Sequence, residues 1–202
     1  SSPDRLLGNV GLDGVFICTP PHLNYELSAK FIEKGVAVFV EKPLADNLSN
    51  AAEMLRLSDS KNIRTSCGYM FAYHPIFKRL KEMIAAKEYG RVIDFDSSCY
   101  ISQVFNKKRP GQAWRYNPQK TGGGVLMTMA SHLAFLLYWY FGEVQSVTST
   151  IKSIYTNMDD EVDAEIMFAD GTRGWVRASW SIKGYEELNI SFKLNFEKAL
   201  VS

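Results

Sequence analysis

The chain has 202 residues, enough for one large domain or two small ones, and its 23 Lys and Arg against 22 Asp and Glu leave a formal net charge of +1. This balance argues against a basic nucleic-acid-binding surface and against an acidic disordered tail. A hydrophobic fraction of 46%, with 13% aromatic residues, can bury a sizeable core and excludes global disorder.

The first third of the chain alternates short apolar runs with helical patterns. In chain order it predicts a strand at Gly14–Cys18, a helix at His22–Lys34, a strand at Val36–Val40, a helix at about Ser49–Leu57 and a strand at Ile63–Cys67. The first two strands are continuously apolar, as is typical of strands buried on both faces of a parallel sheet. Strand–helix–strand order with short connections predicts right-handed crossovers and part of a doubly wound parallel sheet.

After Gly68 the pattern changes. An amphipathic helix begins at Pro75 and ends by Gly90. Strands are then predicted at 92–105, 144–155, 162–168, 173–182 and 188–196. The turn at residues 169–172 (ADGT) indicates a hairpin, and the third of these strands is apolar on one face only. We therefore expect a mostly antiparallel open sheet with helices on one face.

A helix from about Gly124 to Phe141 is apolar almost all round and is expected to cover that sheet. Its longest apolar run, Leu133–Phe141, is about half of the roughly 20 residues that a membrane helix needs, so no membrane span is expected. Together the elements predict an α/β part at residues 1–73, joined near Tyr73 to an α+β part at residues 74–202.

Two polar segments follow consecutive parallel strands, where open sheets bind ligands. They are Thr19-Pro20-Pro21-His22-Leu23-Asn24 and Glu41-Lys42-Pro43. They can form one wall of a nucleotide or substrate cleft, or they can be ordinary prolines that end strands. A lysine placed directly after a buried strand is suited to hydrogen-bonding a reacting oxygen, although a solvated surface lysine is the usual case. A sharp turn that directs Lys42 into a cleft predicts a cis Lys42–Pro43 bond.

The second half offers weaker candidates. Gly122-Gly123-Gly124 can expose helix N–H groups to a ligand or act as a hinge. His132 lies among apolar residues, where a histidine is more often part of the core than a catalyst. The loop that carries Trp114-Arg115 also contains Lys107, Lys108, Arg109 and Lys120. It can bind a phosphate or carboxylate, or it can be solvated.

The cysteines and histidines do not form a metal-ligand pattern, so no metal site is expected. Cys18, Cys67 and Cys99 are far apart, and the histidines are His22, His74 and His132. An odd number of cysteines and no signal peptide at the start of the chain predict a reduced, cytoplasmic protein.

In order and spacing these residues resemble the Gfo/Idh/MocA family of NAD(P)-dependent oxidoreductases. The resemblance runs through essentially the whole chain. Its pieces, in order, are Thr19-Pro20-Pro21 with Asn24, Glu41-Lys42-Pro43, Gly68-Tyr69, Trp114-Arg115, Gly122-Gly123-Gly124, His132, Asp159-Asp160-Glu161 and Phe168-Ala169-Asp170-Gly171. Each piece is weak by itself, whereas the ordered set is specific.

The resemblance implies the following roles. The cofactor, NAD or NADP, would be bound by Thr19, Pro20, Pro21, His22, Asn24, Glu41, Lys42 and Pro43, with Trp114 and Arg115 closing over it. Hydride would pass between the nicotinamide and a hydroxyl or ketone carbon of a sugar, inositol or nucleotide-sugar. Lys42 would hydrogen-bond the substrate hydroxyl, and His132 would be its general acid/base. Thr128 would contact substrate, and the open sheet face would join subunits of a homo-oligomer.

The sequence departs from the family pattern at two places. The family usually has an aspartate four residues before the histidine, where this chain has Thr128, and often another three residues after it, where this chain has Phe135. The family also begins with a Gly-rich phosphate loop, and no G-x-G-x-x-G occurs here. The chain therefore looks like a piece of a longer enzyme, inactive by itself and binding NAD(H) weakly or not at all.

Two other functions fit the same residues. One is a related enzyme that holds NAD tightly and oxidises its substrate transiently before elimination or hydrolysis. The other is a binding or assembly module with a vestigial cleft, which Thr128 in place of aspartate and the absent phosphate loop would favour.

Overall fold

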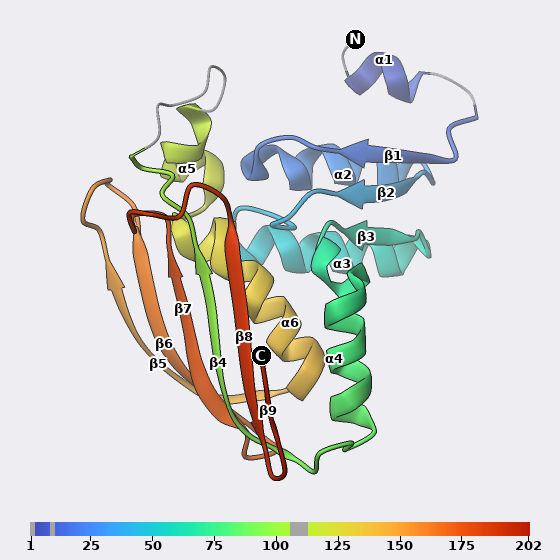
Figure 1. Ribbon diagram of the computed structural model, residues 1–202. Helices are drawn as coiled ribbons and strands as arrows, with labels where there is room; N and C mark the ends of the chain where they lie inside the picture. Colours follow the sequence, from blue (N-terminus) through green and yellow to red (C-terminus); the bar gives the residue numbers. More distant parts are fainter. Residues whose placement is uncertain (1–2, 9–10, 106–112) are drawn as a thin grey trace. The chain divides into compact units, whose positions relative to one another are not determined.

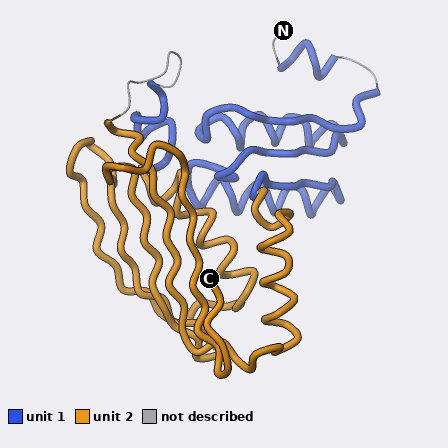
Figure 2. Tube along the Cα trace, viewed as in Figure 1, with its two compact units in different colours: residues 1–69, 110–123 blue, residues 70–109, 124–202 orange. Residues whose placement is uncertain are grey.

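The computed structural model describes residues 3–8, 11–105 and 113–202. The chain divides into two compact units (Figure 2): unit 1 contains residues 1–69 and 110–123, and unit 2 contains residues 70–109 and 124–202. The sequence division at Tyr73 placed everything after it in the second domain. In the structure the division follows Tyr69, and residues 110–123 group with unit 1.

Unit 1 is built on a three-stranded parallel sheet (Figure 1). Its elements are α1 (Pro3–Leu7), β1 (Gly14–Ile17), the 3₁₀ turn η1 (Pro21–Leu23), α2 (Asn24–Glu33), β2 (Ala37–Val40), α3 (Leu48–Lys61), β3 (Thr65–Cys67), the 3₁₀ turn η3 (Ala113–Tyr116) and α5 (Pro118–Thr121). The strand order is β1-β2-β3, and Ile17, Val40 and Cys67 are in register. The carboxyl ends of the three strands therefore lie side by side.

Helix α3 is longer than its sequence pattern indicates. The apolar stripe ends at Leu57, but the helix continues through polar residues to Lys61. Asn62 ends it in the left-handed conformation, with φ of 53°, which asparagine tolerates better than most residues. At the other end the Asn47 side chain accepts the Asn50 N–H as an N-cap.

The expectation that the first two strands are buried on both faces is wrong. The core of unit 1 lies on one face only and consists of Ile17, Phe31, Ile32, Val36, Val38, Val40 and Met54. On the other face Phe16 is 76% exposed, and its ring lies 5.1 Å from that of Phe39. The physical reason is the strand order β1-β2-β3, since two successive right-handed crossovers in the same direction put both helices on one face.

Unit 2 contains a six-stranded sheet in the order β5-β6-β7-β4-β8-β9. Its elements are the 3₁₀ turn η2 (Met70–Tyr73), α4 (Pro75–Ala85), β4 (Val92–Tyr100), the π-helical turn η4 (Leu126–Ala130), α6 (Ser131–Phe141), β5 (Val144–Lys152), β6 (Glu161–Phe168), β7 (Arg173–Ser179), β8 (Asn189–Phe196) and β9 (Leu200–Val201). All neighbouring strands are antiparallel except β4 and β7, which are parallel. The predicted mostly antiparallel open sheet is confirmed.

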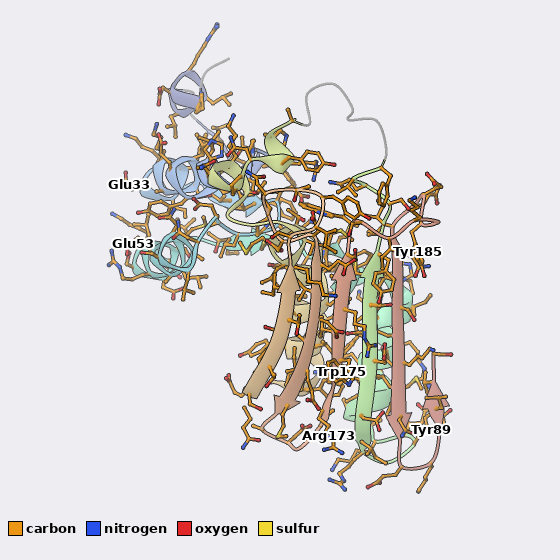
Figure 3. The ribbon with its side chains drawn as sticks, turned by 90° about the vertical axis from the view of Figure 1, so that its left-hand side faces the viewer. Glu33, Glu53, Tyr89, Arg173, Trp175 and Tyr185 are labelled. Carbon is orange, nitrogen blue, oxygen red and sulfur yellow. The ribbon has the colours of Figure 1, made fainter. Side chains whose placement is uncertain are left out.

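Helix α6 covers one face of this sheet (Figure 1). The Phe141 ring lies 5.7 Å from that of Phe95 on β4 and 5.2 Å from that of Phe168 on β6. Arg173, Trp175 and Arg177 alternate on β7 with the buried Gly174, Val176 and Ala178, so they lie on the face opposite α6; Arg173 and Trp175 are labelled in Figure 3.

The apolar helical segment is part of the core. Of the described residues, one stretch, Pro118–Phe141, is long and apolar enough to cross a membrane, and 56% of its most apolar window is buried inside the protein. Gly122, with φ of 77°, separates α5 from the rest of it. Leu133, Leu136 and Leu137 are only 0–1% exposed, so the apolar composition of this stretch reflects its place in the protein core.

Candidate active-site residues

The turn after β1 is shaped by two prolines. Pro20 has φ of −57° and ψ of 143°, an extended conformation that ends the strand, and Pro21 is the first residue of η1. Helix α2 begins directly afterwards at Asn24. The segment Thr19–Asn24 thus lies at the carboxyl edge of the sheet, as the sequence predicts.

The side chain of Asn24 is fully buried and is used within the protein. Its Oδ1 accepts the Thr19 hydroxyl at 2.9 Å. Its Nδ2 donates to the carbonyl oxygens of Glu41, at 3.2 Å, and Pro43, at 3.0 Å. One amide therefore ties the turn after β1 to the turn after β2.

The turn after β2 has the predicted cis Lys42–Pro43 bond. Its first residue remains in the sheet, because the Glu41 N–H donates to the Ile17 carbonyl at 2.8 Å. The Glu41 carboxylate folds back and accepts the Lys42 N–H at 3.2 Å. It also lies against Gly68, where a Cβ would be only 3.1 Å from Oε1. The Lys42 N–H bonds to Glu41, and the Asn24 amide bonds to the carbonyls of Glu41 and Pro43. These bonds hold the backbone before and after Lys42 within unit 1.

Cys67 lies at the end of β3, next to this turn in the sheet. Burial raises the pKa of its thiol to about 11, and the charge of Glu41 acts in the same direction. The thiol is therefore protonated at neutral pH, which argues against a nucleophilic cysteine here.

Trp114 and Arg115 belong to η3, in the same unit as the two turns. The Arg115 guanidinium lies over the Trp114 ring, 4.8 Å from its centroid. The His22 Nδ1 lies 3.3 Å from the Lys120 carbonyl oxygen, which links η1 to α5. All residues predicted to bind the cofactor are thus in unit 1. Lys107, Lys108 and Arg109, predicted as basic members of this loop, lie outside the described residues.

Position 122 requires glycine because its backbone lies very close to the backbone of Asp46. Its φ is 77°, and a Cβ there would lie 1.9 Å from the Asp46 carbonyl oxygen. No side chain fits in that gap. Gly122, the first residue of the Gly122-Gly123-Gly124 motif, therefore packs directly against the loop after β2.

Of the three substrate-binding candidates, Lys42 lies in unit 1, whereas Thr128 and the acid/base candidate His132 lie in unit 2. His132 is 5% exposed in α6, and its ring centroid lies 4.8 Å from that of Phe71 in an edge-on contact. Thr128 is in the π-helical turn η4, and its hydroxyl donates to the Gly124 carbonyl at 2.8 Å. Towards a substrate, that hydroxyl can act only as an acceptor. Single π-helical turns are frequent at functional sites.

Asp159 holds the start of this helical segment. Its carboxylate accepts the N–H of Gly124 at 2.6 Å and of Leu126 at 2.7 Å, and its carbonyl accepts that of Val125 at 2.8 Å. A carboxylate is the favoured partner for a helix N-terminus. The sequence pattern did not predict this cap. A signal for such a cap was present in the sequence, because a glycine triplet precedes an apolar helix and the first N–H groups of any helix need an acceptor.

No metal centre accompanies these residues. Among residues 3–8, 11–105 and 113–202, no three His, Cys, Asp or Glu side chains group as ligands would. The arrangement therefore offers polar turns at a sheet edge and a buried histidine on a capped helix.

Comparison with family models identifies both parts of the chain. Residues 1–69 match the model described as "Oxidoreductase family, NAD-binding Rossmann fold". Residues 77–201 match the model of the GFO/IDH/MocA C-terminal domain.

Individual relatives are distant but cover most of the chain. Oxidoreductase P35 of Formosa agariphila is 26% identical over 93% of this chain and 58% of its own length. The D-xylose dehydrogenase of Paenarthrobacter nicotinovorans is 22% identical over 95% of this chain and 54% of its own. A solved structure of levoglucosan dehydrogenase with NADH and levoglucosan shares the fold, with a TM-score of 0.92, 24% identity, and coverage of 99% of this chain and 56% of that one. The chain spans about half the length of the curated relatives it matches.

Proposed function

The chain belongs to the Gfo/Idh/MocA family of oxidoreductases, and we propose that the complete protein is an NAD(P)-dependent dehydrogenase that oxidises a hydroxyl of a sugar or cyclic polyol. The observation that carries the proposal is the pair of turns after β1 and β2, tied together by Asn24 at the carboxyl edge of a sheet that matches an NAD-binding model. Sugars are the first substrates to test, because a D-xylose and a levoglucosan dehydrogenase are among its relatives.

The residues of unit 1 fit the nicotinamide end of the cofactor. Parallel strands end together there, and Thr19, His22 and Glu41 supply polar groups beside Pro21 and Pro43, which are buried. The sequence contains no G-x-G-x-x-G, the motif that typically holds the cofactor pyrophosphate. When bound, NAD(P) would supply the acceptor for the hydride of the substrate carbinol carbon.

The protein's own residues then handle the hydroxyl proton. The Nζ–H groups of Lys42 hydrogen-bond the substrate oxygen and stabilise the negative charge that develops on that oxygen as the hydroxyl proton leaves. His132 takes the proton, so the alcohol loses a hydride and a proton and becomes a carbonyl. Phe71, which packs edge-on against His132, limits the orientations of its ring.

The proposal is tested by mixing the complete protein with NAD or NADP and a panel of aldoses, anhydrosugars and inositols. Absorbance of the reduced nicotinamide should rise with one or more of them. Bound cofactor without net formation of reduced nicotinamide, but with elimination or hydrolysis products, would identify the transient-oxidation alternative. No cofactor binding at all would favour the assembly module.

The open face of the unit 2 sheet is our proposed homo-oligomer interface. Trp175 is 39% exposed there, and the Arg177 guanidinium lies 5.3 Å from its ring centroid. Arg177 also pairs with Asp96 and, at 3.5 Å, with Asp163. Trp and Arg are among the residues enriched at protein–protein interfaces. We also propose a cytoplasmic location, where the thiols of Cys18, Cys67 and Cys99 would stay reduced.

A further inference from the structure

We infer that Asn24 is a positioning residue for Lys42: its buried amide holds the backbone before and after Lys42 and thereby orients the amine towards substrate. The inference rests on the proposed function, because it requires Lys42 to contact the substrate oxygen. It assigns Asn24 a place behind the site, in contrast to the cofactor contact that the family resemblance implies.

Burial and hydrogen bonding exclude a direct ligand contact by this side chain. Asn24 has 0% of its surface exposed. Its amide has two N–H donors, and the two acceptors on Nδ2 are the carbonyls of Glu41 and Pro43. Its oxygen accepts the Thr19 hydroxyl.

The two accepting carbonyls belong to the residues on either side of Lys42. The Glu41 carbonyl is in the peptide unit that leads into Lys42, and the Pro43 carbonyl is in the one that leaves the turn. Fixing both ends restricts the direction in which the Lys42 Cα–Cβ bond points. A lysine side chain is long and flexible, so the direction of its first bond sets the volume that the amine can search. Misplacement of a reacting group by about 1 Å can cost about 100-fold in rate.

Asn24 is itself held firmly. Its backbone N–H bonds to the Pro21 carbonyl, and it is the first residue of α2. Helix α2 packs its buried Phe31 and Ile32 into the core of unit 1. The amide thus transmits the position of a rigid helix to the turn after β2.

The sharpest variant is Asn24→Asp in the complete protein. It preserves shape and the acceptor for Thr19, but at neutral pH it places a carboxylate oxygen against two carbonyl oxygens. Asn47→Asp is the matched control, because Asn47 is an exposed residue of the same unit whose N-cap role aspartate can also fill. Three quantities are measured: kcat, the Kd of NADH, and kcat in the Lys42→Met background.

If Asn24 acts through Lys42, Asn24→Asp lowers kcat by about 10- to 100-fold while the Kd of NADH changes by less than about threefold. In the Lys42→Met background the same change costs less than about threefold more, because the group it positions is already gone. Asn47→Asp leaves all three values near wild type.

Other outcomes overturn the inference. Unchanged kcat excludes a positioning role, a Kd raised more than kcat is lowered indicates a cofactor contact, and an undiminished loss in the Lys42→Met background indicates general damage to the fold. If Asn24→Asp does not fold, Asn24→Ser removes the forked amide without adding charge, and the same readouts decide. Should Lys42→Met itself retain full kcat, the proposed function of Lys42 fails. Loss of kcat in Lys42→Met with none in Asn24→Asp refutes only this inference.

Discussion

Asp159 and Gly124 approach so closely that any side chain at position 124 would collide with Asp159. The Asp159 Oδ1 accepts the Gly124 N–H at 2.6 Å, and a Cβ on Gly124 would lie 2.2 Å from the Asp159 carbonyl oxygen. Asp159 directly precedes the buried Asp160 and strand β6, whereas Gly124 begins the helical segment that carries Thr128 and His132. The pair therefore joins that helical segment to the sheet of unit 2.

We predict that Gly124→Ala destabilises the protein by about 1–3 kcal/mol, because a methyl group there overlaps backbone atoms that cannot move independently. Thermal or denaturant unfolding measures the change. Gly14→Ala is the control, since a Cβ at Gly14 would make an ordinary 3.4 Å contact. Equal stability of Gly124→Ala and the wild type would show that the close approach is not maintained in solution.

Asp160 is predicted to make stability depend on pH. Burial by itself would raise the pKa of this carboxyl, but hydrogen bonds from the Trp180 indole at 2.6 Å, the Tyr155 N–H at 2.5 Å and the Thr156 hydroxyl at 2.7 Å lower it below its ordinary value. A lowered native pKa contributes stability that is present above the unfolded-state pKa of about 4 and is lost as the pH falls through the native pKa.

Asp160→Asn should therefore cost on the order of 3 kcal/mol at pH 7, because an amide cannot accept all of these bonds. The difference from wild type should shrink below about pH 4, where the wild-type carboxyl begins to lose its advantage. Urea unfolding at several pH values measures both quantities. A difference that stays constant from pH 7 to pH 3 would mean that the charge of Asp160 contributes nothing.

Thr128→Asp tests the acid/base assignment. A carboxylate one turn before His132 favours the imidazolium form, so the limb of the pH–rate profile that reports His132 should move to higher pH. Thr128→Val should leave that limb in place and reduce kcat only modestly, because it removes a hydroxyl whose proton is already donated to Gly124. A profile unchanged by the new carboxylate would argue that His132 is a core residue.

Trp175→Lys tests the proposed oligomer interface. A second positive charge beside Arg177 on a face that meets its own copy should shift the complete protein towards monomer. Light scattering after size-exclusion chromatography measures the mass, with Leu48→Lys, an 84% exposed position in unit 1, as the control. A wild-type monomer at working concentration would contradict the interface directly.

The fold was predictable where local pattern decides it. Alternation along residues 162–168 and the ADGT turn predicted the β6–β7 hairpin, and the apolar runs predicted β1 and β2. The exposure of Phe16 was not predictable, because a run of apolar residues does not show which faces helices will cover. The parallel pairing of β4 with β7 depends on long-range topology, which strand patterns do not contain.

The positions of the site candidates at the sheet edge were predictable, but the hydrogen bonds that connect them were not. The prolines after β1 and β2 indicated the edge of the sheet, and the turn indicated the cis bond at Pro43. The sequence could not show that Asn24 spans both turns or that Asp159 caps the helical segment of His132, because each link joins residues far apart in the chain. The grouping of Trp114 and Arg115 with unit 1 is likewise a tertiary property.

We propose that Lys42 acts on the substrate hydroxyl during hydride transfer. The measurement for this role is the single-turnover rate of nicotinamide reduction in the complete protein, saturated with cofactor and with the sugar or polyol it oxidises. Lys42→Met should lower that rate by about 100-fold or more, with the Kd of NADH close to that of the wild type. A rate near that of the wild type at saturation would show that Lys42 does not act on the reacting hydroxyl.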